Sequence, residues 1–234
     1  MIGKALLVVA CALAPPAIAL GLWLTADTHP LLPGMRGCEH VRDIAARIGC
    51  FTDRFDDARK ADGLPLALRH VDRLSHTSPK LASSCHLAWH RVGERDGVRA
   101  AGDKSLHVPR APATHCADGY VHGFVIGFLH EAPEDTTPRQ LAELCITSSD
   151  TQRETGNCVH ALGHHVARAT RDERSGVQTC VRIATHLPGL ARECVYAMYM
   201  EYSIEDLRAG RAAGNPCRTA PAAARVGCYA FLPA

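Results

Sequence analysis

The cysteines constrain the fold of this chain more than any other feature of its sequence. The chain has 234 residues and 11 Cys, ten of which follow the apolar N-terminal stretch that contains Cys11. None of the ten forms a C-x-x-C pair, so zinc knuckles, thioredoxin-type redox motifs and covalent haem attachment sites are excluded. An even number of cysteines without these motifs predicts a disulfide framework in a chain exported to an oxidising compartment.

The spacing of these cysteines is periodic, and six of them recur at intervals of 31 to 42 residues. The six are Cys50, Cys85, Cys116, Cys158, Cys194 and Cys228. Four of the six follow another cysteine by 11 to 14 residues, which predicts local bridges. The predicted local bridges are Cys38–Cys50, Cys145–Cys158, Cys180–Cys194 and Cys217–Cys228. Cys85 and Cys116 lack such a neighbour, so we expect them to pair with each other.

Two sets of segments around the cysteines have the apolar spacing of helices, with apolar residues three and four positions apart. The first set comprises residues 66–74, 141–146 and 177–184. The second set starts at or near a recurring cysteine and comprises residues 85–92, 120–129, 158–167 and 194–201. Turn signals separate the two sets, so each unit is predicted to be helix, turn, helix.

The period of these units determines the expected architecture. Units of this length with two helices each predict an all-α fold of disulfide-stapled αα-hairpin repeats, forming a solenoid or a closed helical array. The second set of segments is the more apolar and contains small residues that permit close packing. We therefore expect it to form the inner layer, and we expect the proline-containing segments 108–113 and 132–138 to be loops.

The N-terminal segment, residues 1–27, is predicted to direct the chain out of the cytoplasm. Residues 5–24 carry no charge, and 20 residues at about 1.5 Å each span a hydrocarbon core of roughly 30 Å, as a signal-anchor helix does. Pro15 and Pro16 interrupt such a helix, and Ala17-Ile18-Ala19 fits the cleavage site of a secretory signal instead. Lipid attachment at Cys11 is a third alternative. Each alternative leaves residues 28–234 as a periplasmic or extracellular domain, anchored to the membrane or secreted, with residues 31–37 as a short tether if the anchor is retained.

The charge balance argues against nucleic acid as a partner. The formal net charge is +2, no basic tract occurs, and only 5% of the residues are aromatic. Such a chain offers neither a strong phosphate-binding surface nor stacking platforms for bases. The expected partners are the membrane, through an uncleaved N-terminal segment, and a protein bound on the repeat surface.

The 14 histidines indicate a metal site where the predicted inner helices meet. His86 and His90 are four residues apart, as are His160 and His164, and this spacing places two imidazoles on one face of a helix. His122 occupies the position equivalent to His160 in the repeat. Imidazole nitrogens bind zinc, copper and iron, which predicts a mononuclear or dinuclear site formed by these five histidines. A haem held by two axial histidines also suits the spacing.

Other residues of the predicted inner helices suggest a further ligand for this site, and they also allow an alternative hypothesis. Glu201 is placed to supply a carboxylate to the site. Alternatively, the histidines belong to a structural polar network with Tyr196 or Tyr199. The remaining histidines, His115 among them, are expected on the surface or in loops.

The motifs of common enzymes do not support a specific catalytic activity. The segment His160-Ala161-Leu162-Gly163-His164 lacks the glutamate that an H-E-x-x-H protease uses as its base, and G-x-S-x-G and G-x-G-x-x-G are absent. The sequence therefore predicts metal or haem binding first and a protein-interaction scaffold second. A metal-dependent enzyme with an open coordination position is the third alternative.

Overall fold

The computed structural model describes residues 31–102, 109, 111, 114–130, 136–170, 172–208 and 225. Within them all regular secondary structure is helical, so the predicted all-α class is confirmed for the described part of the chain. The helices are α2 (Leu31–Glu39), α3 (Ile44–Asp62), α4 (Leu64–Ser75), α5 (Pro79–Ala82), α6 (Cys85–Gly102), α7 (His115–His130), α8 (Pro138–Thr147), α9 (Gln152–Thr170), α10 (Glu173–Ala184) and α11 (Ala191–Arg208). Every segment that was predicted as helical from its apolar spacing lies inside one of them. The predicted N-terminal segment 1–27 and the predicted Cys217–Cys228 bridge lie outside the described residues.

Among the helices that the structure describes, none is both long enough and apolar enough to cross a membrane.

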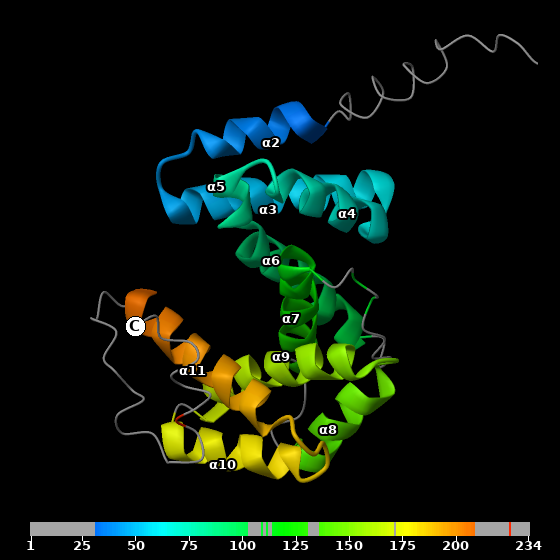
Figure 1. Ribbon diagram of the computed structural model, residues 1–234, viewed down its shortest axis with the longest axis vertical. Helices are drawn as coiled ribbons and strands as arrows, with labels where there is room; N and C mark the ends of the chain where they lie inside the picture. The colour runs from blue at the N-terminus through cyan, green and yellow to red at the C-terminus, as the bar shows by residue number, and fades with distance from the viewer. Residues whose placement is uncertain are drawn as a thin grey trace, which may run out of the picture.

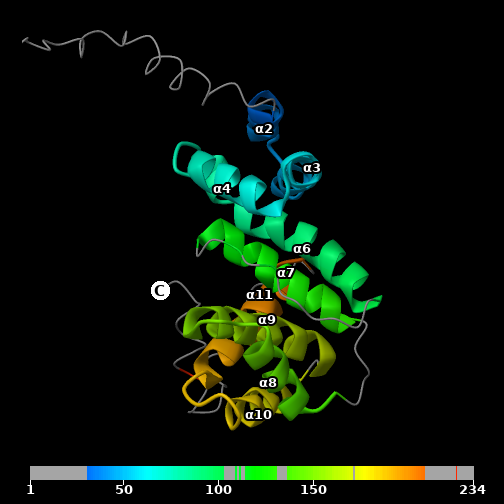
Figure 2. The ribbon, with the colours of Figure 1, turned by 90° about the vertical axis from the view of Figure 1, so that its right-hand side faces the viewer.

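The helices form two groups that meet at α6 and α7. In Figure 1, α2 to α5 lie at one end of the molecule, α8 to α11 lie at the other, and α6 and α7 lie between them. Figure 2 shows α6 and α7 side by side, and their contact is the most extensive between any two described helices. One hydrophobic core includes Phe55 stacked on Trp89, and the other includes Ile183. Helix α7 joins the two, because Phe124 belongs to the first core and Val125 to the second.

Four disulfides link helices of the described chain, and all four match the predicted pairings. They are Cys38–Cys50 between α2 and α3, Cys85–Cys116 between α6 and α7, Cys145–Cys158 between α8 and α9, and Cys180–Cys194 between α10 and α11. Three of them join consecutive helices across a short turn. The bridge Cys85–Cys116 instead joins the first turns of α6 and α7 across a sequence separation of 31 residues. Four intramolecular disulfides are typical of a protein of an oxidising compartment.

Two segments that were expected to be irregular are partly helical. Residues 31–37, predicted as a tether, lie in α2, which the Cys38–Cys50 bridge joins to α3 and whose Met35 is buried in the first hydrophobic core. The sequence predicts Pro138 in a loop, whereas the structure has it as the first residue of α8. Proline suits this position because its missing N–H has no intrahelical partner there, and Thr137 completes the helix start with a capping box to Gln140.

Glycines bring α6 and α7 into direct backbone contact. A Cβ atom on the α7 glycines would lie only 1.8 to 2.2 Å from carbonyl oxygens of α6. The facing pairs are Gly119 with His86, Gly123 with His90, and Gly127 with Glu94. Residue numbers rise together along these pairs, so the two helices are parallel. Two glycines of α6 contribute in the same way, Gly93 against Tyr120 and Gly97 against Phe124.

Helices α9 and α11 form a second parallel pair with one such close contact. A Cβ on Gly163 would lie 2.1 Å from the carbonyl oxygen of Cys194. Further along, Arg168 of α9 contacts Glu201 of α11. The predicted second set of segments therefore provides the four helices α6, α7, α9 and α11, which pack in two close pairs.

Candidate metal centre

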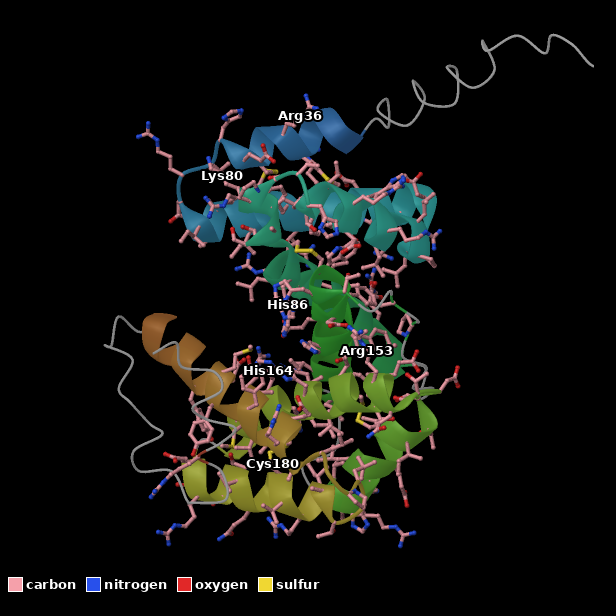
Figure 3. All side chains as sticks on the ribbon, in the orientation of Figure 1. Arg36, Lys80, His86, Arg153, His164 and Cys180 are labelled. Carbon is pink, nitrogen blue, oxygen red and sulfur yellow. A yellow bond between two sulfur atoms is a disulfide. The ribbon has the colours of Figure 1, made fainter. Side chains whose placement is uncertain are left out.

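The five predicted histidines lie together where the two parallel helix pairs meet. His86 and His90 come from α6, His122 from α7, and His160 and His164 from α9. In Figure 3 the side chains of His86 and His164 lie in the region between α6 and α9. Neighbouring rings have centroids 4.5 to 5.9 Å apart. The contacting pairs are His86–His122, His122–His160, His160–His164 and His90–His164.

Glycine packing explains why the α6 and α7 histidines meet. The backbone of α7 touches α6 at the carbonyl groups of His86 and His90, through Gly119 and Gly123. His122 lies in the same stretch of α7, so its side chain leaves the helix at the level of the two α6 histidines. A bulkier residue at either glycine would separate the helices at this level.

Three of the five histidines, His122, His160 and His164, form a compact buried triad. Their exposed fractions are 5%, 8% and 2%, and one ring nitrogen from each lies within 4.8 Å of those of the other two. Tetrahedral ligands at about 2.0 to 2.1 Å from zinc are roughly 3.3 Å apart, so small side-chain rotations bring these nitrogens around one ion. His86 and His90 are half-buried and lie next to this triad without being part of it.

The triad also contains buried polar atoms that the surrounding protein does not satisfy. Nδ1 of His122, Nε2 of His160 and Nε2 of His164 are buried and have no hydrogen-bond partner among the described residues. Each buried polar atom without a partner costs about 1 to 3 kcal/mol, and such atoms are rare in proteins. A metal ligand needs a nitrogen that is not already engaged in a hydrogen bond, and this cluster contains three such imidazole nitrogens.

A carboxylate orients one member of the triad. Nδ1–H of His164 donates a hydrogen bond to Oε2 of Glu201 on α11, at 2.9 Å. The other oxygen of Glu201 accepts from Nε of Arg168 at 2.9 Å, and Arg168 also contacts Glu94 on α6 at 3.2 Å. Burial alone would raise the pKa of Glu201, but the hydrogen bonds from His164 and Arg168 and the positive charge of Arg168 outweigh burial and lower it to about 2.

This hydrogen bond selects the nitrogen of His164 that can bind a ligand. Because the ionised Glu201 can only accept, the proton of His164 stays on Nδ1 and Nε2 presents its lone pair. Carboxylates hold metal-binding histidines in this way in many proteins, where they fix the ring and increase its basicity.

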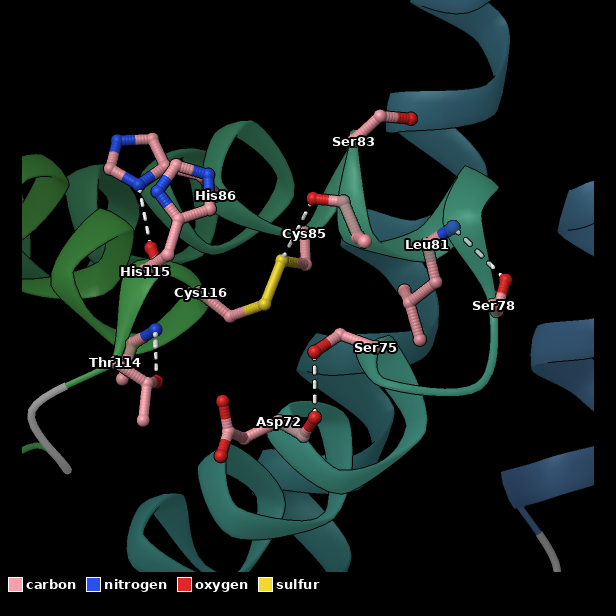
Figure 4. The surroundings of a disulfide bond; sticks show 12 residues. Asp72, Ser75, Ser78, Leu81, Ser83, Cys85, His86, Thr114, His115 and Cys116 are labelled. Carbon is pink, nitrogen blue, oxygen red and sulfur yellow. Dashed lines mark hydrogen bonds between the residues drawn. A yellow bond between two sulfur atoms is a disulfide. The ribbon is translucent and has the colours of Figure 1, made fainter.

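The backbone orients His86 in a similar way. Figure 4 shows the hydrogen bond from Nδ1–H of His86 to the carbonyl oxygen of His115, at 2.7 Å, beside the Cys85–Cys116 disulfide. His86 is therefore in the tautomer that carries a lone pair on Nε2. Burial lowers the pKa of His86 to about 4, against the opposing effect of this hydrogen bond, so the ring is neutral at pH 7.

His122, His160 and His90 are also neutral at pH 7. Burial, followed by the charges of the neighbouring imidazoles, lowers the pKa of both His122 and His160 well below 6.5. Burial and the nearby His164 have the same effect on the pKa of His90. Neutral rings keep the lone pairs that metal ligation requires, and protons do not compete for them near neutral pH.

The surroundings of the cluster differ in part from the sequence prediction. Glu201 was expected to supply a carboxylate, and it contacts His164 rather than a position at the centre of the triad. Tyr196 lies beside His160, with ring centroids 5.3 Å apart, whereas Tyr199 donates to Glu173 instead of joining the cluster. Neither neighbour donates to the three unpartnered nitrogens.

Two further parts of the site were not predicted from the sequence. His115 is exposed, as expected, but its ring stacks on His86 with centroids 4.7 Å apart. Arg168 was missed, although it follows His164 by four residues and so shares its helix face. That spacing was the one local signal that could have identified it.

Compared with family models, curated proteins and solved structures, the chain matches none. Functional conclusions therefore rest on the geometry of the site itself.

Proposed function

We propose that the protein binds one transition-metal ion through His122, His160 and His164. The observation that carries this proposal is the convergence of three buried imidazoles, each with an unpartnered ring nitrogen. The hydrogen bond from His164 to Glu201 supports it, because it supplies the outer partner that metal-binding histidines have. His86 and His90 lie close enough to complete or adjust the coordination.

The donor set favours an ion that accepts nitrogen ligands. Zinc, copper and iron bind imidazole well, whereas magnesium and calcium prefer oxygen. The eight cysteines in the described part of the chain are all in disulfides, so no thiolate from that part competes as a ligand. When bound, such an ion supplies Lewis-acid chemistry or, for copper and iron, electron transfer.

The ring packing favours an ion over haem. The rings of His122 and His160 are stacked with centroids 4.5 Å apart, and the other neighbouring rings are also in contact. A porphyrin between two axial histidines would need these rings to separate widely. The burial of the triad similarly favours holding an ion over turning over a bulky substrate.

The proposal also covers the repeat architecture that carries the site and the location of the protein. The hairpins α8–α9 and α10–α11, each linked by a disulfide, support a repeat of αα-hairpins whose inner helices carry the ligands. The disulfides also support a location outside the cytoplasm, with residues 1–27 as signal or anchor. A protein partner on the outer helices belongs to the rival scaffold function, in which the histidines are structural.

Metal analysis of the protein tests the proposal directly. The chain is exported through an oxidising compartment without a histidine tag, and its metal content is measured after purification and after titration with Zn²⁺, Cu²⁺ and Co²⁺. We expect about one ion per chain, and loss of binding when His160→Gln and His164→Gln are combined. The matched control combines His76→Gln with His186→Gln, two exposed histidines outside the cluster, and it should keep its metal.

The scaffold function predicts the opposite outcome. A wild-type chain that binds no metal, with a double variant that loses only stability, would contradict the metal site. Metal content that is the same in wild type and in the His160→Gln, His164→Gln variant would contradict the assignment of the ligands.

A further inference from the structure

We propose that His115 and His86 form the entry site through which a metal ion reaches the buried triad. This inference rests on the metal site proposed above and adds a route to it. His115 is exposed, His86 is half-buried, and His122 is buried, so the three rings lead from solvent into the cluster. From the sequence alone, His115 is expected to lie on the surface or in a loop, outside the metal site.

The rings along this route are in contact at each step. Centroid distances are 4.7 Å from His115 to His86, 5.2 Å from His86 to His122, and 4.5 Å from His122 to His160. An ion with bonds of about 2.0 to 2.1 Å joins nitrogens up to roughly 4 Å apart. Adjacent imidazoles at these separations can therefore pass an ion by small ring rotations, without returning it to water.

The hydrogen bonding of His86 suits a transfer role. Its Nδ1–H is held by the carbonyl oxygen of His115, so Nε2 keeps a lone pair for a passing ion. The Cys85–Cys116 disulfide joins the residue before His86 to the residue after His115. This bridge keeps the two rings together at the first turns of α6 and α7, as Figure 4 shows.

Charges along the route favour inward movement of a cation. The entry pair lies at the N-termini of α6 and α7, where the helix dipoles are positive and a cation binds weakly. The far side of the cluster carries the carboxylates of Glu201 and Glu94 around one cation, Arg168. An ion is therefore held loosely at the surface and more tightly in the interior.

The side of the cluster next to Arg168 is a poorer entrance. The guanidinium of Arg168 lies between Glu94 and Glu201 and its side chain is 31% exposed. An approaching ion would have to displace Arg168 from these two carboxylates before it reached His164. Approach along His115 and His86 instead meets two stacked imidazole rings, with centroids 4.7 Å apart.

A comparison of binding rates with equilibrium affinity tests the route. Co²⁺ association is followed by its visible absorption in a stopped-flow instrument at pH 7.5, and dissociation is followed after addition of chelator. For His115→Gln we expect both rate constants to fall by about tenfold, with Kd within roughly twofold of the wild type. A residue on the path changes the barrier in both directions but leaves the two end states unchanged.

The exposed His186→Gln variant is the matched control, and both of its rate constants should equal those of the wild type. Unchanged rates in His115→Gln would overturn the entry route, as would a weaker Kd with an unchanged association rate, which would make His115 a ligand. A wild-type chain that binds no Co²⁺, Zn²⁺ or Cu²⁺ would overturn the metal site itself. These outcomes therefore separate failure of the route from failure of the proposed function.

Discussion

The close contact between α6 and α7 at Gly123 predicts how strongly a substitution there lowers the stability of the fold. A Cβ at Gly123 would lie 1.8 Å from the carbonyl oxygen of His90 and 2.8 Å from the backbone nitrogen of Glu94. Ordinary contact begins at 3.4 Å, so Gly123→Ala must separate the helices by about 1.6 Å at this level. Both obstructing atoms belong to helix backbone and cannot rotate away as a flexible side chain could.

The energetic cost follows from this geometry. Overpacking of a tight interior costs about 1 to 3 kcal/mol, and rigid backbone on the opposing side places Gly123→Ala at the upper end. The higher helix propensity of alanine offsets about 1 kcal/mol of this destabilisation. We therefore expect Gly123→Ala to lower the free energy of unfolding by about 2 kcal/mol.

Gly156→Ala in α9 is the matched control, because a Cβ there meets nothing within 4 Å. It should raise the free energy of unfolding by about 0.5 to 1 kcal/mol, through helix propensity alone. Urea unfolding of both variants, followed by circular dichroism with the disulfides intact, measures the difference. A Gly123→Ala variant as stable as the wild type, or equal effects of both substitutions, would refute the close-contact reasoning.

The same substitution reports on the metal site. His122 and His90 lie at the level of Gly123, and metal sites require ligand distances within about 0.2 Å of their ideal values. Separation of the helices by about 1.6 Å should therefore weaken Co²⁺ binding by tenfold or more in Gly123→Ala. Gly156→Ala should bind Co²⁺ as the wild type does.

Two further predictions concern the chemistry of the cluster. Glu201→Gln should weaken Co²⁺ binding by about 10- to 100-fold, because an amide holds the His164 ring without supplying charge; an unchanged Kd in the titration would contradict this role. Metal-free protein should lose stability as the pH falls below 6.5, because His86, His122 and His160 take up protons in the unfolded chain but stay neutral when buried. The loss is at most about 1.4 kcal/mol per pH unit for each histidine, and equal urea midpoints at pH 7 and pH 5.5 would argue against it.

The local features of this protein follow from its sequence. Apolar residues three and four positions apart determine where the helices form, because that spacing brings them onto one face. Cysteines 12 to 14 residues apart on consecutive helices can reach each other across one turn, so Cys145–Cys158 and Cys180–Cys194 were predictable from spacing. The pairs His86–His90 and His160–His164 were predictable for the same reason, since four residues make about one helical turn.

The tertiary structure decided how these local features combine. Glu201 reaches His164 across 37 residues of sequence, and Glu94 reaches Arg168 across 74, so no local spacing links them. The ligand-binding nitrogen of His164 is set by the Glu201 hydrogen bond, which depends on how α9 packs against α11. The stacking of His115 on His86 likewise depends on α6 and α7 being parallel. Sequence periodicity predicts which residues share one face of a helix. Which helix faces contact each other depends on how closely the helix backbones can pack.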